Sequence, residues 1–163
     1  MPDAAAIAAT VTDPELPMLT LADLGVLREV SERDGVVTVS ITPTYTGCPG
    51  MDAMRAELER ALMHAGYREV HTRIVLQPAW STDWISERGR RNLAEAGIAP
   101  PGPATHHVSG PIPLTLTAPP SRTRCPRCGS SDTELVSRYG ATACKSLRRC
   151  RACREPFEQF KEI

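Results

Sequence analysis

The chain has 163 residues, of which 41% are apolar, 23% charged and 4% aromatic, so it can form one full domain and a smaller one but not a large multidomain enzyme. Nineteen Lys and Arg balance nineteen Asp and Glu, which excludes a uniformly polybasic nucleic-acid binder and an acidic disordered tail. The charge is uneven, however: residues 1–120 carry nine basic and fourteen acidic side chains, and residues 121–163 carry ten and five. We therefore expect two parts with different surfaces.

Membrane and export signals are not evident in the sequence. No stretch approaches the ~18 apolar residues of a membrane span, and no basic residue precedes the alanines of Met1–Val11. We therefore expect a cytoplasmic protein without membrane contact. Five of the six cysteines lie between Cys125 and Cys153, and in the cytoplasm such a cluster favours metal or thiol chemistry over disulfides.

The first elements are a short helix and a hairpin. Ala4–Val11 is typical of a short helix, which the prolines that follow it would end. Val26–Ser31 and Val36–Ile41 are rich in β-branched residues and flank Asp34-Gly35, a dipeptide typical of tight hairpin turns. These residues predict two antiparallel strands.

From residue 49 the apolar period changes from that of a strand to that of a helix. Apolar residues recur at i, i+3 and i+4 over Pro49–Ala65, and Gly66 follows as a stop signal. Tyr67–Leu76 then predicts a third strand, and Thr82–Ala96, closed by Gly97, a further helix. The order α-β-β-α-β-α predicts an α+β domain built as a small two-layer sandwich.

A proline-rich stretch divides the chain. Seven of the fifteen prolines fall between Pro100 and Pro120, in a run without charged residues that we interpret as a linker with a short strand at Ile112–Thr117. We expect this linker to insulate a small C-terminal module, which is too short to fold on an apolar core alone, from the first domain. The predicted boundaries are 1–103 for the first domain, 104–121 for the linker and 122–163 for the module.

Two CxxC pairs stand in the C-terminal module. Cys125 and Cys128 form the first and Cys150 and Cys153 the second, and 21 residues separate them. Such pairs can surround one tetrahedral cation, so we predict a zinc ribbon whose closed four-thiolate site is structural. Iron or an iron-sulfur cluster shares these ligands and stays an alternative. We interpret Cys144 as a small packing residue and not as a ligand.

Basic side chains are abundant in the same module. Four thiolates on a divalent cation contribute −2, which reduces its nominal charge of +5 to about +3. This modest charge favours a solvated surface, or a face for an acidic protein, over nucleic-acid contact. A nucleic-acid-binding ribbon protein is kept as an alternative function.

Cys48 stands apart from the other cysteines, at the predicted start of the helix over Pro49–Ala65. Unpaired amides at a helix N-terminus lower the pKa of a thiol, so this position suits metal transfer or redox chemistry. The alternatives are a buried packing residue and the centre of a thiol oxidoreductase. Asp13 and Glu15 could form an acidic rim with Asp23, although Asp13-Pro14 is more typical of a turn or helix cap.

Several of these motifs resemble a known family. Asp13-Pro14-Glu15, Asp23–Val26 and Thr44–Pro49 together resemble the metal-sulfur cluster assembly (MIP-eighteen) family, whose members assist iron-sulfur cluster assembly. With Pro78–Ile85 and Tyr139–Lys145, the chain resembles one branch of that family, the D subunits of phenylacetyl-CoA epoxidase systems.

The resemblance implies a function and a set of partners. It implies a non-catalytic accessory or maturation factor of a multicomponent di-iron monooxygenase in aerobic phenylacetate degradation. The implied partners are the oxygenase or reductase subunits of that complex, and the implied task is assembly of an iron or iron-sulfur centre. Cys48 is then the candidate contact for iron or a cluster.

Overall fold

The computed structural model describes residues 3–45, 47–104 and 123–163. The predicted linker beyond residue 104, and with it the predicted strand at Ile112–Thr117, lies outside the described residues. None of the helices in the described ranges is long and apolar enough to cross a membrane.

A three-stranded sheet forms one layer of the first domain. It consists of β1 (Leu27–Arg33), β2 (Val36–Ile41) and β3 (Glu69–Ile74), in the order β1-β2-β3. β1 and β2 are antiparallel, whereas β2 and β3 are parallel. The turn between β1 and β2 has positive φ at Asp34 (52°) and Gly35 (80°), so the hairpin predicted from this dipeptide is confirmed.

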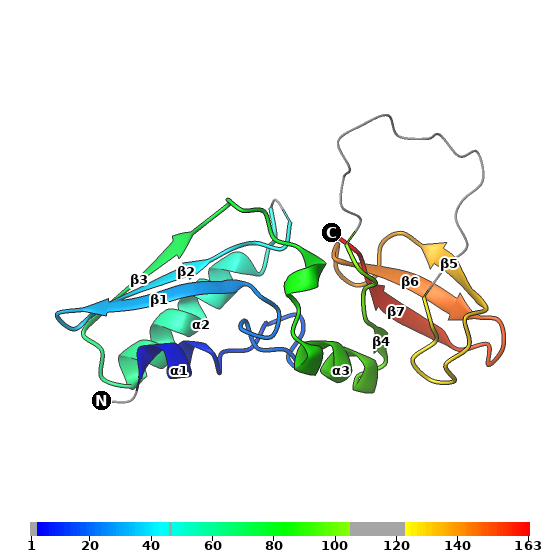
Figure 1. Cartoon of the computed structure of the whole chain (residues 1–163), viewed down its shortest axis with the longest axis horizontal. Helices are drawn as coiled ribbons and strands as arrows, with labels where there is room; N and C mark the ends of the chain where they lie inside the picture. Colours follow the sequence, from blue (N-terminus) through cyan, green and yellow to red (C-terminus); the bar gives the residue numbers. More distant parts are fainter. Residues whose placement is uncertain (1–2, 46, 105–122) are drawn as a thin grey trace.

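Two helices form the other layer (Figure 1). α1 (Ala4–Ala8) packs against α2 (Met51–His64), and α2 carries the chain from β2 across to the parallel strand β3. The core lies between the layers. It includes Leu58 and Leu62 of α2 and Val37 and Val39 of β2, all fully buried.

The prediction of a single helix over Thr82–Ala96 is wrong, because this segment forms two elements. A 3-10 turn, η1 (Thr82–Trp84), is followed by α3 (Glu87–Glu95). Ser86 between them is extended, and its hydroxyl accepts a hydrogen bond from the Gly89 amide at 2.9 Å. This side chain caps a new helix and so ends the preceding turn.

A second sheet contains the three strands of the C-terminal module and one short strand from before the proline-rich stretch. It has the order β4-β7-β6-β5 and consists of β4 (Ile98–Ala99), β5 (Thr133–Ser137), β6 (Lys145–Cys150) and β7 (Pro156–Phe160). β4 runs parallel to β7, although it precedes the proline-rich stretch. The predicted fold class is confirmed: an α+β sandwich is followed by a β module with four clustered cysteines.

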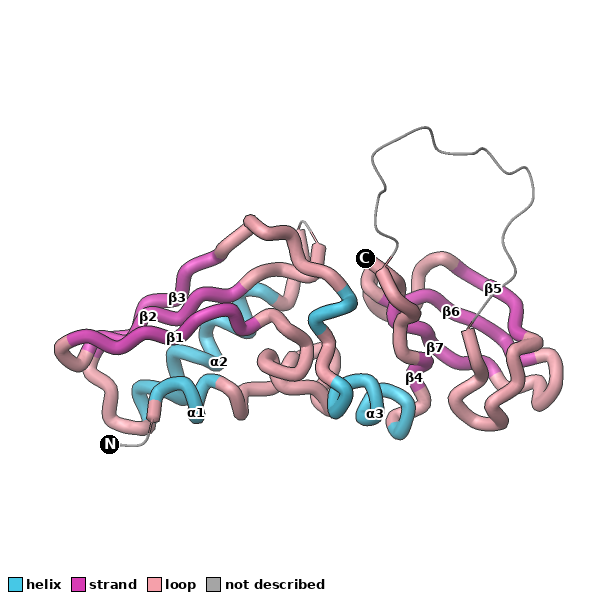
Figure 2. The backbone as a smooth tube through the Cα atoms, viewed as in Figure 1, coloured by secondary structure: helices cyan, strands magenta, loops and turns pink. Residues whose placement is uncertain are grey.

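The two parts share a core, so the expected insulation between them is wrong. Phe160 of β7 is fully buried in the same cluster as Leu24 and Trp80. The rings of Trp80 and Phe160 lie 5.9 Å apart, and the Trp80 indole N–H donates to the Leu24 carbonyl at 2.9 Å. Figure 2 shows the second sheet at the end of the first domain, beside α3.

Candidate functional site

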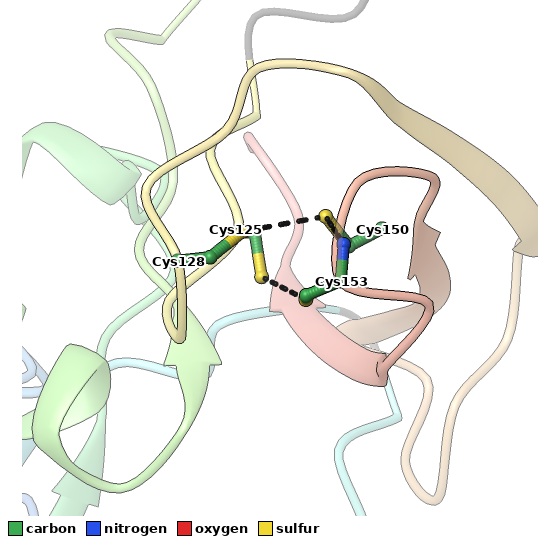
Figure 3. Close-up of side chains that lie close together, drawn as sticks. All are labelled: Cys125, Cys128, Cys150 and Cys153. Atoms are coloured by element: carbon green, nitrogen blue, oxygen red, sulfur yellow. Dashed lines mark hydrogen bonds between the residues drawn. The ribbon is translucent and has the colours of Figure 1, made fainter.

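The two CxxC pairs meet at one end of the second sheet. Cys125 and Cys128 lie on a tight turn that Gly129 closes with a positive φ of 74°, and the Gly129 amide donates to the Cys125 carbonyl at 2.9 Å. Cys150 is the last residue of β6, and Cys153 follows in the next turn. Figure 3 shows the four side chains directed toward one another from the two turns.

The sulfur positions fit one tetrahedral ion. The Sγ atoms of Cys125 and Cys153 are 3.7 Å apart, those of Cys128 and Cys150 are 3.5 Å apart, and all four lie within 4.8 Å of one another. A tetrahedron with metal–sulfur bonds of about 2.3 Å has edges of about 3.8 Å. The four sulfurs are therefore placed so that they could hold one metal ion.

The electrostatics of this cluster also call for a cation. A hydrogen bond from the Cys153 amide lowers the pKa of the Cys150 thiol to about 7. The Glu155 amide favours the Cys153 thiolate, but burial and the three neighbouring sulfurs outweigh it and raise the pKa of Cys153 to about 12. Four thiolates so close together are stable only with a positive charge among them.

Three basic side chains among the described residues of the module form ion pairs with its own carboxylates. The ion pairs include Arg127–Glu155 at 2.9 Å, Arg151–Glu134 at 3.0 Å and Lys145–Glu158 at 2.8 Å. These pairs weaken any field that would attract a phosphate backbone. They therefore favour the interpretation of a solvated surface over the nucleic-acid alternative.

Cys48 lies close to the start of α2, as predicted, with only Pro49 and Gly50 between it and the helix. Its side chain is partly buried, and its sulfur accepts a hydrogen bond from the amide of Gly50, the N-cap residue of the helix. The helix N-terminus thus points at the thiol, as expected. The neighbouring Thr44 hydroxyl is a second hydrogen-bond partner of this sulfur.

The predicted effect on acidity is wrong, however. Burial, as the largest cause, raises the pKa of the Cys48 thiol above its ordinary value, and the charges of Glu15 and Asp13 add to this effect. The hydrogen bonds to the sulfur act in the opposite direction but do not compensate. Without a cation the thiol is protonated, which opposes the thiol oxidoreductase alternative.

The three carboxylates predicted to form an acidic rim lie in two different places. Asp13 is buried and accepts hydrogen bonds from the amides of Glu15 (2.8 Å) and Leu16 (2.9 Å), so it caps a turn as expected. Asp13 and Glu15 also line a small pocket next to Cys48. Asp23 instead pairs with Arg88 at 2.8 Å and does not line that pocket.

The sequence did not predict that Cys144 lies beside this pocket. It is buried, as expected for a packing residue, but it lines the same pocket as Cys48. The two cysteines are far apart in the sequence and lie in different predicted domains. The only signal in the sequence was that Cys144 belongs to neither CxxC pair.

Fold and site together define a class: a small α+β domain of the iron-sulfur assembly type joined to a zinc ribbon. The family model described as "Iron-sulfur cluster assembly protein" matches residues 5–71, and that described as "PaaD zinc beta ribbon domain" matches residues 110–161. An Escherichia coli (strain K12) protein, named as the putative D subunit of 1,2-phenylacetyl-CoA epoxidase, is 40% identical over 158 residues, which are 97% of this chain and 90% of that protein. The chain belongs to this family of epoxidase D subunits, which confirms the resemblance seen in the sequence.

More distant relatives match about half of the chain. An "Fe-S protein maturation auxiliary factor" of Porphyromonas gingivalis (strain ATCC BAA-308 / W83) is 33% identical over 86 residues, covering 52% of this chain and 81% of that protein. The crystal structure of a domain of unknown function, DUF59, from Bacillus anthracis has a TM-score of 0.49 at 24% identity, covering 55% of this chain and 86% of that one.

Proposed function

We propose that this chain is an accessory factor of a multicomponent phenylacetyl-CoA epoxidase and assists assembly of an iron or iron-sulfur centre in that enzyme. The near full-length similarity to an epoxidase component supports the association with the epoxidase, and the similarity to a maturation factor supports the task. The oxygenase and reductase subunits are the proposed partners.

In this proposal the ribbon is structural and binds zinc. Cys125, Cys128, Cys150 and Cys153 supply four thiolates whose spacing suits zinc and leaves no position for a substrate. The ion would hold together a module that has only a small core of its own.

Cys48 would make the contact with the iron or cluster that is being assembled. The observation that carries this proposal is its thiol, held between the Gly50 amide and a pocket lined by Asp13 and Glu15. A partly buried thiol of raised pKa keeps its proton until a cation displaces it, so it can bind a metal without being a strong nucleophile beforehand.

The test replaces the sulfur and keeps the size of the side chain. Cys48→Ser should fold normally but remove the soft ligand. In a host with the other epoxidase subunits, we expect oxygenase or reductase with reduced iron content, and slow growth on phenylacetate. Metal analysis of the purified subunits measures this loss.

Ala53→Ser is a matched control, because it adds a hydroxyl to the exposed side of the first turn of α2, which follows Cys48 in the chain. This variant should support full iron loading. If a folded Cys48→Ser chain at normal level also supports full loading and normal epoxidation, Cys48 is a packing residue and the proposed role is wrong.

A further inference from the structure

The ribbon places a second thiol beside Cys48. Cys144 directly precedes β6, is only 5% exposed, and belongs to the buried cluster against which Cys48 packs. Both cysteines line one pocket at the junction of the two parts. The Thr142 hydroxyl lies 3.1 Å from the Cys144 sulfur and fixes its position.

Two carboxylates face the same pair of thiols. Asp13 and Glu15 line the pocket from the loop after α1, and their negative charges add to burial in raising the pKa of Cys48 and of Cys144. Lys145 is the cation that acts on Cys144, but its ammonium is bound to Glu158 at 2.8 Å. Residues with thiol or carboxylate groups from three segments thus line one pocket.

The size of the pocket limits its occupant. The cavity has a volume of about 10 Å³. A single water molecule or ion needs about this much, whereas an organic substrate needs hundreds of Å³. Two thiols with nearby carboxylates are donors suited to a borderline-soft transition metal such as Fe(II).

We propose that Cys48 and Cys144, with Glu15 and Asp13 beside them, form a second metal site, which binds one ferrous ion as cargo. This inference rests on the proposed function and deepens it, because it names the second ligand and the form of the cargo. Binding forms two Fe–S bonds and releases the two thiol protons to solvent, with no change in oxidation state.

The junction donors are less closely gathered than the ribbon cysteines. Among the described residues, only the four ribbon cysteines have all their donor atoms within 4.8 Å of one another. No three of the junction donors meet this limit, so their side chains must move closer together to bind one ion, and such binding is weaker than in the ribbon.

Binding of Co(II), a spectroscopic substitute for Fe(II), tests the inference. The full chain is loaded with zinc in the ribbon and titrated with Co(II) without oxygen. We expect one Co(II) beyond the zinc, with thiolate-to-metal absorption. Cys48→Ser and Cys144→Ser should each lose about half of that absorption and bind Co(II) about 10–100-fold more weakly or worse.

Two further variants guard against effects on folding. Ala143→Ser, an exposed neighbour of Cys144, should bind Co(II) like the unmodified chain. Glu15→Gln keeps both thiols and the fold, so it should keep the absorption per bound ion while the affinity falls. Zinc content and circular dichroism verify that each variant is folded.

The outcomes separate the two proposals. If folded Cys144→Ser binds Co(II) with unchanged absorption while Cys48→Ser does not, the two-thiol site is wrong and the role of Cys48 stands. If no ion binds beyond the zinc, the site is also wrong, while iron loading in the epoxidase host still decides the proposed function. If both variants lose the absorption but support full loading, the site exists and the proposed function is wrong.

Discussion

Asp23 connects two segments of the first domain through one buried carboxylate: the turn over Thr20–Asp23 and the start of α3. It accepts hydrogen bonds from the Thr20 hydroxyl, the Ser86 hydroxyl at 2.6 Å, and Nε and Nη2 of Arg88. Burial alone would raise the pKa of this carboxyl, but these hydrogen bonds outweigh it and lower the pKa below its ordinary value. The ionised form of Asp23 therefore stabilises the fold.

Replacing Asp23 by Asn should destabilise the domain by about 1–2 kcal/mol at pH 7, because hydrogen bonds to the charged carboxylate are lost. The loss is no larger because Arg88 is exposed to solvent, so its ion pair with Asp23 contributes little. The native pKa lies below the unfolded value near 3.8, so this stabilisation is present above pH 4 and is lost as the pH falls through the native pKa. Urea unfolding at pH 7 and pH 3 measures the effect. The difference between Asp23→Asn and the unmodified chain should shrink at pH 3.

Asp34→Asn serves as the control for this prediction. Asp34 is exposed in the β1–β2 turn, where its positive φ suits Asn equally well. We expect no change in the unfolding midpoint at either pH. A difference for Asp23→Asn that is the same at pH 7 and pH 3 would contradict the role of its charge.

Sequence reasoning at single residues succeeds where the cause is local. The cap at Asp13 and the position of Cys48 before a helix follow from neighbouring residues. The raised pKa of Cys48 does not, because burial depends on chain segments that pack from elsewhere. For the same reason the sequence could not pair Cys48 with Cys144.

At the scale of elements, the hairpin and α2 could be predicted because each carries its own stop or turn signal. Asp34-Gly35 fixes the turn, and Gly66, with a φ of 104°, ends the helix region. The break at Ser86 was missed because a cap inside an apolar helical pattern resembles an ordinary helical serine. β4 has only two residues, which is too short for any periodicity.

Gly25 fixes the approach of β1 to the 3-10 turn η1. Its φ is +74°, and a Cβ atom there would lie 2.7 Å from the Trp84 Cβ and 2.9 Å from the Trp84 carbonyl oxygen. Because part of this contact is with backbone, a small side-chain rotation cannot relieve it. The glycine is required for both reasons.

Gly25→Ala should therefore destabilise the domain well beyond the ~1–2 kcal/mol that positive φ alone costs. Gly35→Ala is the matched comparison, because its φ of +80° is similar but a Cβ there meets no described atom within 4 Å. Thermal unfolding of both variants measures the difference. Equal losses at the two positions would show that the Trp84 contact contributes nothing.

At the scale of the whole molecule, the shared core makes the ribbon part of the first domain's stability. Phe160 is fully buried against Trp80, and the Ile163 carbonyl accepts a hydrogen bond from the Thr82 amide at 3.1 Å. The sequence suggested independent parts because the proline-rich stretch separates them along the chain. That distance does not limit packing between residues on either side of it.

Removing the ribbon metal with a chelator should consequently disturb the first domain. We expect the ribbon to lose its order and Trp80, now 5% exposed, to become solvated, with a red shift of its fluorescence. Trp84→Phe removes the signal of the other tryptophan. Re-addition of zinc should reverse the shift, and fluorescence unchanged by a chelator that extracts the metal would contradict this coupling.

The pairing of β4 with β7 also sets an order of events during synthesis. β1, β2, α2 and β3 all lie within residues 27–74, so they can pack while the ribosome is still translating the rest. Ile98 must wait for its partner Glu158, which is 60 codons later and takes roughly 3–12 s to appear at about 5–20 residues per second. During that interval the Cys48 pocket lacks the wall that Cys144 provides, so the thiol faces the solvent of the nascent chain until translation is nearly complete.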